Sequence, residues 1–214
     1  MPSVVGGSIR LQLPPGSSPT LCGMCRGLLG ENAPEGIARV CRGEYIPTGG
    51  NMLIAHEVFN SIALFDTAMT HGGCDTEIVG RAVASGITVA IAPAAIVHHV
   101  IPPYRLTSSY FRWAATRAGC QLAYRDCKKC GRARMFLVCV ARAGQVILVN
   151  LPLLILSLSM GNSSQSLYRR CLLWRANGYV RQAASIAIRS KGGLLTSRLE
   201  FRKERTSFQH VAEQ

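Results

Sequence analysis

The sequence predicts an α/β domain followed by a helical, membrane-associated region. Short β-prone segments alternate with helix-forming segments in the first part of the chain, and a strongly apolar stretch follows. Hydrophobic residues make up 48% of the chain and the mean hydropathy is +0.19, which is high for a soluble domain. We therefore expect the α/β domain over residues 1–125, a basic and apolar helical region over 126–190, and a polar, basic tail over 191–214.

The first half of the α/β domain is predicted from local signals. Residues 3–11 are β-prone and enter a loop rich in Pro, Gly and Ser. A domain that starts on an apolar strand is expected to have a partner strand upstream, so Met1 is interpreted as a late start or a truncation. The further predicted elements are a short helix over 36–42, a turn over 47–51, an apolar run over 52–54 and a helix over 57–62.

The second half of the domain is predicted as one helix and two strands. Apolar residues at helical spacing predict a helix over 77–85, with Asp75 or Thr76 as its N-cap. Strands are expected over 88–91 and 96–100, separated by a break at Pro93.

The carboxyl-terminal half is predicted as helices joined by a basic loop. A helix over 108–123 carries aromatic and Arg residues side by side, and a basic loop over 125–134 follows. The apolar segment 143–160 is about long enough to cross a membrane, which takes ~20 residues. It fits a single crossing, a re-entrant or in-plane anchor, or a buried helix of a soluble core. An amphipathic helix over 167–188 completes this part.

Charge is distributed unevenly along the chain. Residues 1–100 carry five Lys and Arg against seven acids, whereas residues 101–214 carry 19 against four, for a total of +13. The basic half therefore predicts an anionic partner, either phospholipid headgroups or nucleic acid. Because an apolar segment follows at once and no nucleic-acid motif is present, we expect membrane lipids and no nucleic acid.

Nine cysteines without an amino-terminal signal peptide favour a reducing compartment. Two pairs, Cys22-x-x-Cys25 and Cys127-x-x-Cys130, have the spacing of zinc half-sites. About 100 residues separate the pairs, so free thiols are the preferred interpretation over a shared metal.

Four motifs keep the order and spacing of a known enzyme family. They are Pro47-Thr48-Gly49-Gly50-Asn51-Met52, Phe65-Asp66, Gly72-Gly73-x-Asp75-Thr76-Glu77 and Ala92-Pro93-x-Ala95-x-Val97-x-His99. Together they resemble the acceptor-side half of a family 2 glycosyltransferase with a GT-A (Rossmann-like) fold, over roughly residues 4–125. The resemblance implies an incomplete GT-A domain, because the family's donor-binding half with its Asp-x-Asp metal motif has no counterpart in the sequence.

The resemblance implies an inverting sugar transfer with Asp75 as the catalytic base. A carboxylate fixed at a helix start can take the proton of the acceptor hydroxyl as that hydroxyl attacks the anomeric carbon. Local sequence alone favours an ordinary helix cap at Asp75. Cys74 replaces an acidic residue of the family and supplies hydrogen bonds poorly, so either the acceptor differs or activity is impaired. Glu77 is either a partial substitute or an exposed capping residue.

The remaining site residues also follow from the resemblance. Gly49 and Gly50 would bring the backbone close to the acceptor, and the Asn51 amide would bond a sugar hydroxyl, although the same residues form ordinary turns. His99 would bind the donor's Mg²⁺ or Mn²⁺ or its phosphates, and the alternative is a half-buried histidine at a strand end.

The complete form would transfer a sugar from a nucleoside-diphosphate sugar to a polysaccharide or lipid-linked acceptor at the cytoplasmic face of a membrane. Two alternatives come from other classes. One is a catalytically inactive, basic, membrane-associated protein. The other is a zinc- or nucleic-acid-binding protein built on the two Cys-x-x-Cys pairs.

Overall fold

The computed structural model describes residues 3–16, 21–41, 46–67 and 73–188, so the tail predicted over 191–214 lies outside the described residues. Contacts divide the chain into two compact units. The sheet unit comprises Met1–Pro14 and Leu29–Ile101, and the helical unit comprises Pro15–Leu28 and Pro102–Gln214.

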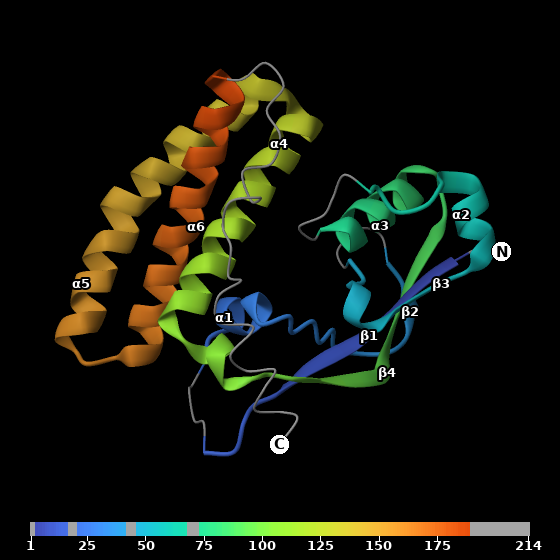
Figure 1. The fold of residues 1–214 in the computed structure, drawn as a ribbon, viewed down its shortest axis with the longest axis horizontal. Helices are drawn as coiled ribbons and strands as arrows, with labels where there is room; N and C mark the ends of the chain where they lie inside the picture. Colours follow the sequence, from blue (N-terminus) through green and yellow to red (C-terminus); the bar gives the residue numbers. More distant parts are fainter. Residues whose placement is uncertain (1–2, 17–20, 42–45, 68–72, 189–214) are drawn as a thin grey trace. The chain divides into compact units, whose positions relative to one another are not determined.

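The sheet unit holds a mixed four-stranded sheet in the order β2-β4-β1-β3 (Figure 1). Its strands are β1 (Ser3–Gln12), β2 (Arg39–Val40), β3 (Met52–Ile54) and β4 (Thr88–Val100). The central strands β1 and β4 are parallel, and the edge strands β2 and β3 are antiparallel to their neighbours. The strand predicted over 3–11 is therefore confirmed, and the apolar run over 52–54, for which no strand was predicted, forms β3.

Pro93 does not divide β4 into two strands, which corrects the prediction of separate strands over 88–91 and 96–100. The strand runs on, and its register with β1 shifts between Gly7 and Ser8, so that Gly7 pairs with Ala92 but Ser8 pairs with Ile96. A proline has no N–H for the ladder, and a bulge is where a strand tolerates it. The Ser8 hydroxyl donates to the Pro93 carbonyl oxygen at 2.7 Å and closes the bulge.

Helices α2 (His56–Ile62) and α3 (Cys74–Ala84) pack on the sheet through one core. The core joins Val4 of β1 and Val89 and Ile91 of β4 to apolar residues of both helices. These helical residues are Val58, Ile62, Ile78, Val79 and Ala82. They recur at helical spacing, which is why the sequence predicted both helices.

A helix predicted over 36–42 is not present in its described part, residues 36–41. Arg39 and Val40 instead form β2, which pairs with Ile91 and Ala90 of β4. The Cys41 N–H donates to the Val89 carbonyl oxygen at 2.7 Å and extends this pairing. The β4 edge offered unpaired backbone groups, and satisfying these groups outweighed the weak local helix signal.

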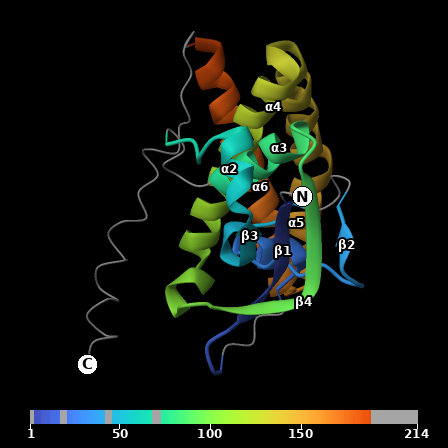
Figure 2. The same ribbon diagram turned by 90° about the vertical axis from the view of Figure 1, so that its right-hand side faces the viewer.

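The helical unit contains α1 (Gly23–Leu28), the 3₁₀-helix η2 (Pro103–Leu106), α4 (Ser108–Gln145), the π-helix η3 (Val146–Asn150), α5 (Leu151–Ser159) and α6 (Ser163–Ile188) (Figures 1 and 2). The basic loop predicted over 125–134 is wrong, because α4 runs through it with one kink at Gly131 (φ 79°, ψ 170°). We call residues 132–159, beyond this kink, the apolar arm. The arm runs beside α6 (Figure 1).

The first part of α4 crosses α6 at two glycines. A Cβ atom at Gly119 would lie 2.0 Å from the Arg175 carbonyl oxygen, and one at Gly178 would lie 2.0 Å from the Thr116 carbonyl oxygen. Only glycine lets the two backbones approach this closely. Beyond the crossing, Ala123, Met135, Tyr179, Ala183 and Ile186 form a buried core.

Candidate functional site

The structure brings together the two glycine-containing motifs that resemble the acceptor site. The Gly49 N–H, in the 3₁₀-helix η1 (Gly49–Asn51), donates to Asp75 Oδ2 at 3.0 Å. Asp75 lies in the first turn of α3 and is half-buried. The first turn of a helix is a position that suits an acidic side chain, because the helix dipole is positive there.

Asp75 is not the N-cap that local sequence predicted. The helix begins earlier, at Cys74, and Gly73 is its N-cap in the left-handed conformation (φ 88°, ψ 0°). The Gly73 carbonyl oxygen accepts from the Glu77 N–H at 2.9 Å, so the first helical bond already spans Asp75. The other oxygen of Asp75, Oδ1, accepts from the Thr76 N–H at 2.8 Å. Two backbone N–H groups thus fix this carboxylate, one on each oxygen.

Asn51 links η1 to the bulge between β1 and β4. Its Nδ2 donates to the Ser8 carbonyl oxygen at 2.9 Å and to the Ala95 carbonyl oxygen at 2.8 Å. Both amide donors of Asn51 are therefore used by the backbone, and only Oδ1 has no role in this link. Gly7 is required here, because a Cβ at Gly7 would lie 2.3 Å from both Ala95 O and Asn51 Nδ2.

Gly50 and Cys74 flank the carboxylate without contacting it through a polar group. A Cβ at Gly50 would lie 2.8 Å from Ile9 Cδ1, so the glycine lets η1 pack against β1. Cys74 is a half-buried free thiol at the first position of α3. A thiol there adds neither charge nor a strong acceptor to the surroundings of Asp75.

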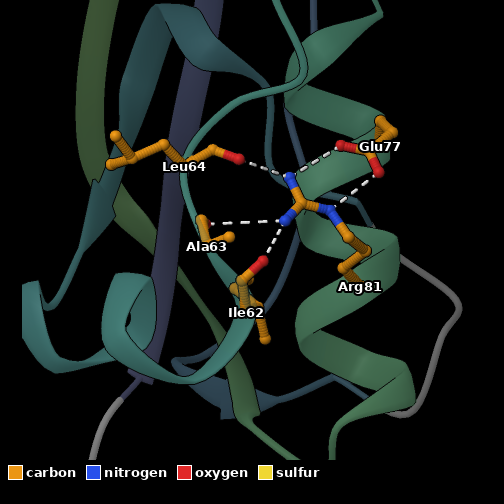
Figure 3. Close-up of polar contacts among 5 residues, drawn as sticks. All are labelled: Ile62, Ala63, Leu64, Glu77 and Arg81. Carbon is orange, nitrogen blue, oxygen red and sulfur yellow. Dashed lines mark hydrogen bonds and ion pairs between the residues drawn. The ribbon is translucent and has the colours of Figure 1, made fainter.

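Glu77 forms an ion pair with Arg81, one helical turn further along α3 (Figure 3). Glu77 Oε1 lies 2.7 Å from Arg81 Nε, and Oε2 lies 2.9 Å from Nη2. The same guanidinium donates to the carbonyl oxygens of Ile62, the last residue of α2, and of Ala63 and Leu64, which follow it. We call this group of five residues the Arg81 clamp. Glu77 serves it by fixing Arg81, a role that the i,i+4 spacing of the two residues could have indicated.

His99 lies on β4, paired in register with Leu11 of β1. Its ring is half-buried beside Gly30, where a Cβ would lie 3.2 Å from Nδ1. His98 pairs with Arg10 and is exposed. Over the described ranges, no three His, Cys, Asp or Glu side chains converge in a way that could hold a metal ion. The metal-binding role that the resemblance implies for His99 therefore stays a prediction.

A shallow hollow opens beside α2, and Asp75 is not among the residues that line it. Its volume is about 630 Å³, and it is lined by His56, Phe59, Asn60, Ala63, Leu64 and Phe65. Ala63 has a positive φ (62°) with ψ at 178°, a conformation that L-residues rarely adopt. The Arg81 clamp holds the carbonyl oxygen of this strained residue.

One helical stretch in the described part of the chain, Ser108–Ser159, contains a segment apolar and long enough to cross a membrane. Only 6% of its most apolar window is buried, so the described residues do not enclose this segment as a core helix. The exposed side chains of the apolar arm include Leu137, Val140, Ile147, Leu148, Ile155 and Leu156. So large an exposed apolar face marks a surface that contacts lipid or another apolar partner.

The two Cys-x-x-Cys pairs of the helical unit have different surroundings. Cys25 Sγ lies 3.4 Å from Cys22 Sγ and 4.0 Å from Cys171 Sγ on α6. Cys127 packs instead at the core that contains Met135 and Tyr179. All nine cysteines are free thiols. The contact with Cys171 was not predictable, because 146 residues separate the two positions in the sequence.

Comparison of this chain with protein-family models, with curated proteins and with solved structures gives no match.

Proposed function

We propose that this chain provides the acceptor side of a membrane-attached, family 2-like glycosyltransferase of GT-A type. The observation that carries the proposal is the hydrogen bond from the Gly49 N–H to Asp75 Oδ2 at 3.0 Å. The two sequence motifs that resemble an acceptor site meet at this bond, although 26 residues separate them. A chance resemblance of two short motifs gives no reason for them to be neighbours in space.

In this proposal Asp75 acts as the general base. The oxygen of an acceptor hydroxyl attacks the anomeric carbon of a nucleoside-diphosphate sugar, its proton passes to the Asp75 carboxylate, and the nucleoside diphosphate leaves with the bonding electron pair. Displacement from the opposite side inverts the anomeric configuration. The N–H groups of Gly49 and Thr76 orient the carboxylate, and its remaining lone pairs are available to the acceptor.

In this proposal the nucleoside-diphosphate sugar is bound by a separate donor-binding half and not by the residues described for this chain. The described residues offer no metal site for the donor phosphates, and the family's Asp-x-Asp segment has no counterpart in the sequence. No step of the proposed reaction is therefore assigned to His99. The acceptor is a polysaccharide or a lipid-linked glycan.

The apolar arm supports attachment to a membrane. Its exposed apolar face lies between basic segments of α4 and α6, and anionic lipids attract such segments by ~1 kcal/mol per Lys or Arg near the surface. Because both flanks are basic, we place both at the cytoplasmic face, with the arm in the plane of the membrane or re-entrant. A single crossing is the alternative topology.

Binding of glycans to the full chain in uncharged lipid nanodiscs tests the acceptor assignment. A panel of oligosaccharides and lipid-linked sugars is screened against wild type, Asp75→Asn and Glu57→Gln. Glu57 is a suitable control because it is also an acid in the first turn of a helix, α2, and is exposed. We expect Asp75→Asn to weaken binding about tenfold through loss of charge-assisted hydrogen bonds, with Glu57→Gln unchanged. A panel without any binder, or equal binding by all three proteins, would overturn the proposal.

A second candidate is a catalytically inactive membrane protein with the same partial fold. It is favoured by the commitment of Glu77 to Arg81 and of the Asn51 amide to the backbone. Sugar transfer with a donor-binding half added in trans separates the two candidates, since the inactive protein gives no transfer with any donor.

A further inference from the structure

Two arginines of the helical unit, one on the apolar arm and one on α6, lie near Tyr179 of α6. Arg142 lies in the arm, with its Cζ 4.7 Å from the centre of the Tyr179 ring on α6. Arg175 lies one turn earlier on α6, and its pKa is lowered by burial and by the positive charge of Arg142. Both side chains are half-buried, so two like charges share a partly desolvated place.

Neither arginine forms an ion pair with an acid in the described part of the helical unit. The one described acid there is Asp126, and its Oδ2 accepts the Tyr179 hydroxyl at 3.0 Å. The Nε–H of Arg142 is buried and has no hydrogen-bond partner among the described residues. A buried N–H that has lost water without gaining an acceptor is costly, and an anion would remove that cost together with the repulsion between the two arginines.

A second polar contact between the apolar arm and α6 has both a donor and an acceptor. Asn150 of the arm is buried, and its Oδ1 accepts from Arg169 Nη1 of α6 at 3.3 Å. At Asn150 the arm provides an acceptor and α6 provides the arginine that donates to it. At Arg142 the arm provides a donor, and Arg175 of α6 is also a donor, so an acceptor for them has to come from another molecule.

We propose that Arg142 and Arg175 together bind the phosphate of an anionic phospholipid, whose acyl chains lie on the exposed apolar face of the arm. Arg142 directly precedes the apolar segment 143–160, and this is the depth at which headgroup phosphates meet an inserted helix. Two guanidinium groups present planar N–H pairs that match phosphate oxygens, and the same arm carries exposed apolar side chains such as Leu137 and Val140. The inference rests on the proposed membrane attachment.

Native mass spectrometry of the full chain, released from uncharged detergent micelles, measures the bound lipid directly. The probes are phosphatidylglycerol, oleate as an anionic lipid without phosphate, and inorganic phosphate as competitor. The variants are Arg142→Gln, Arg142→Lys and Arg175→Gln. Arg134→Gln is the matched control, because Arg134 lies on the same arm and is exposed.

We expect wild type to retain phosphatidylglycerol over oleate, and Arg142→Gln and Arg175→Gln to lose roughly tenfold or more in affinity, with Arg134→Gln unchanged. Arg142→Lys should also lose affinity, since an ammonium lacks the planar pair of donors. Competition by inorganic phosphate at concentrations similar to those of the lipid would support the phosphate site but assign it to free phosphate. Equal losses in Arg134→Gln, or equal retention of oleate, would show attraction by general charge and overturn the site.

Thermal melting in the same micelles keeps the test independent of folding defects. Without an anion, Arg142→Gln should melt close to the wild-type temperature, because loss of the repulsion from Arg175 offsets loss of the contact with the Tyr179 ring. Phosphatidylglycerol should raise the melting temperature of wild type more than that of the variant, and equal increases would contradict the site. Failure of membrane attachment would instead appear as release of wild type and all variants from membranes without detergent, whatever their lipid affinity.

Discussion

The backbone N–H of Gly49 and the Oδ2 atom of Asp75 lie 3.0 Å apart and join the turn before β3 to the first turn of α3. The bond orients a half-buried carboxylate at the edge of the sheet unit. An asparagine at position 75 could keep this hydrogen bond, because its Oδ1 can accept from the same N–H. Structural and catalytic roles of Asp75 can therefore be separated by one substitution.

Asp75→Asn should preserve folding and abolish sugar transfer. Loss of a general base typically lowers the rate ~10²- to 10⁴-fold, since an amide cannot take the acceptor proton. The measurement is the initial transfer rate with a donor-binding half added in trans, together with thermal melting of each protein. Cys74→Glu should raise the rate if the thiol impairs the site. A wild-type rate in Asp75→Asn would reduce Asp75 to a structural residue of α3.

Gly7→Ala should destabilise the sheet unit by about 2 kcal/mol or more, because its Cβ would meet Ala95 O and Asn51 Nδ2 at 2.3 Å. The matched control is Gly80→Ala on the exposed side of α3, where a new Cβ meets nothing within 4 Å. That change should stabilise by roughly 0.5–1 kcal/mol through helix propensity. Chemical denaturation gives both values, and similar effects at the two sites would contradict the packing at the bulge.

Local sequence was sufficient to predict the elements whose apolar residues recur at the spacing of a helix or of a strand. The strand β1 and the helices α2 and α3 agree with their predictions because each buries one face against the same core. Predictions failed where backbone pairing or helix continuation outweighed the local signal. Pro93 was accommodated in a bulge, Val40 joined the β4 edge, and the basic stretch before Gly131 continued α4.

The candidate site was predictable as a set of motifs and not as an arrangement. The sequence pointed to Gly49 and Asp75 separately, and their contact depends on how η1 and α3 sit on the sheet. The Arg81 clamp could have been predicted only in part. The Glu77–Arg81 spacing is a local signal, whereas the bonds to the carbonyl oxygens after α2 are tertiary.

Arg81→Met should destabilise the sheet unit by about 1–2 kcal/mol, because the carbonyl oxygens of Ile62 and Leu64 lose a charged donor. Glu77→Gln should cost only ~0.3–0.5 kcal/mol, the usual size of a partly exposed i,i+4 ion pair. Arg10→Met, at an exposed position of β1, is the control and should be nearly neutral. Urea denaturation distinguishes the three, and a large loss in the control would show that general charge is responsible.

The Cys25 thiol should resist alkylation in the folded protein. A hydrogen bond with Cys171 and burial raise its pKa above the ordinary thiol value, so the reactive thiolate is scarce at about pH 8. The folded state then keeps a proton that the unfolded state releases as the pH rises past the ordinary thiol pKa. Stability therefore falls with rising pH in that window, and Cys25→Ala should reduce this slope. Iodoacetamide mapping by mass spectrometry should label Cys74 before Cys25, and the reverse order would contradict the buried thiol pair.

The apolar arm should hold the protein in membranes through its exposed face. Leu148 and Ile155 are 77% and 67% exposed, and a charged residue at the centre of a membrane segment costs about 2.5–3.5 kcal/mol. We therefore expect wild type to remain in the membrane pellet after high-salt and alkaline carbonate washes, whereas the double variant Leu148→Lys, Ile155→Lys is released or fails to insert. Asn177→Lys, at an exposed position of α6, adds positive charge outside the arm and should behave as wild type.

High salt screens surface charge and leaves apolar insertion intact, so release of wild type by salt alone would indicate adsorption through the basic segments. Monodisperse wild-type protein in buffer without detergent would contradict membrane attachment through the arm altogether.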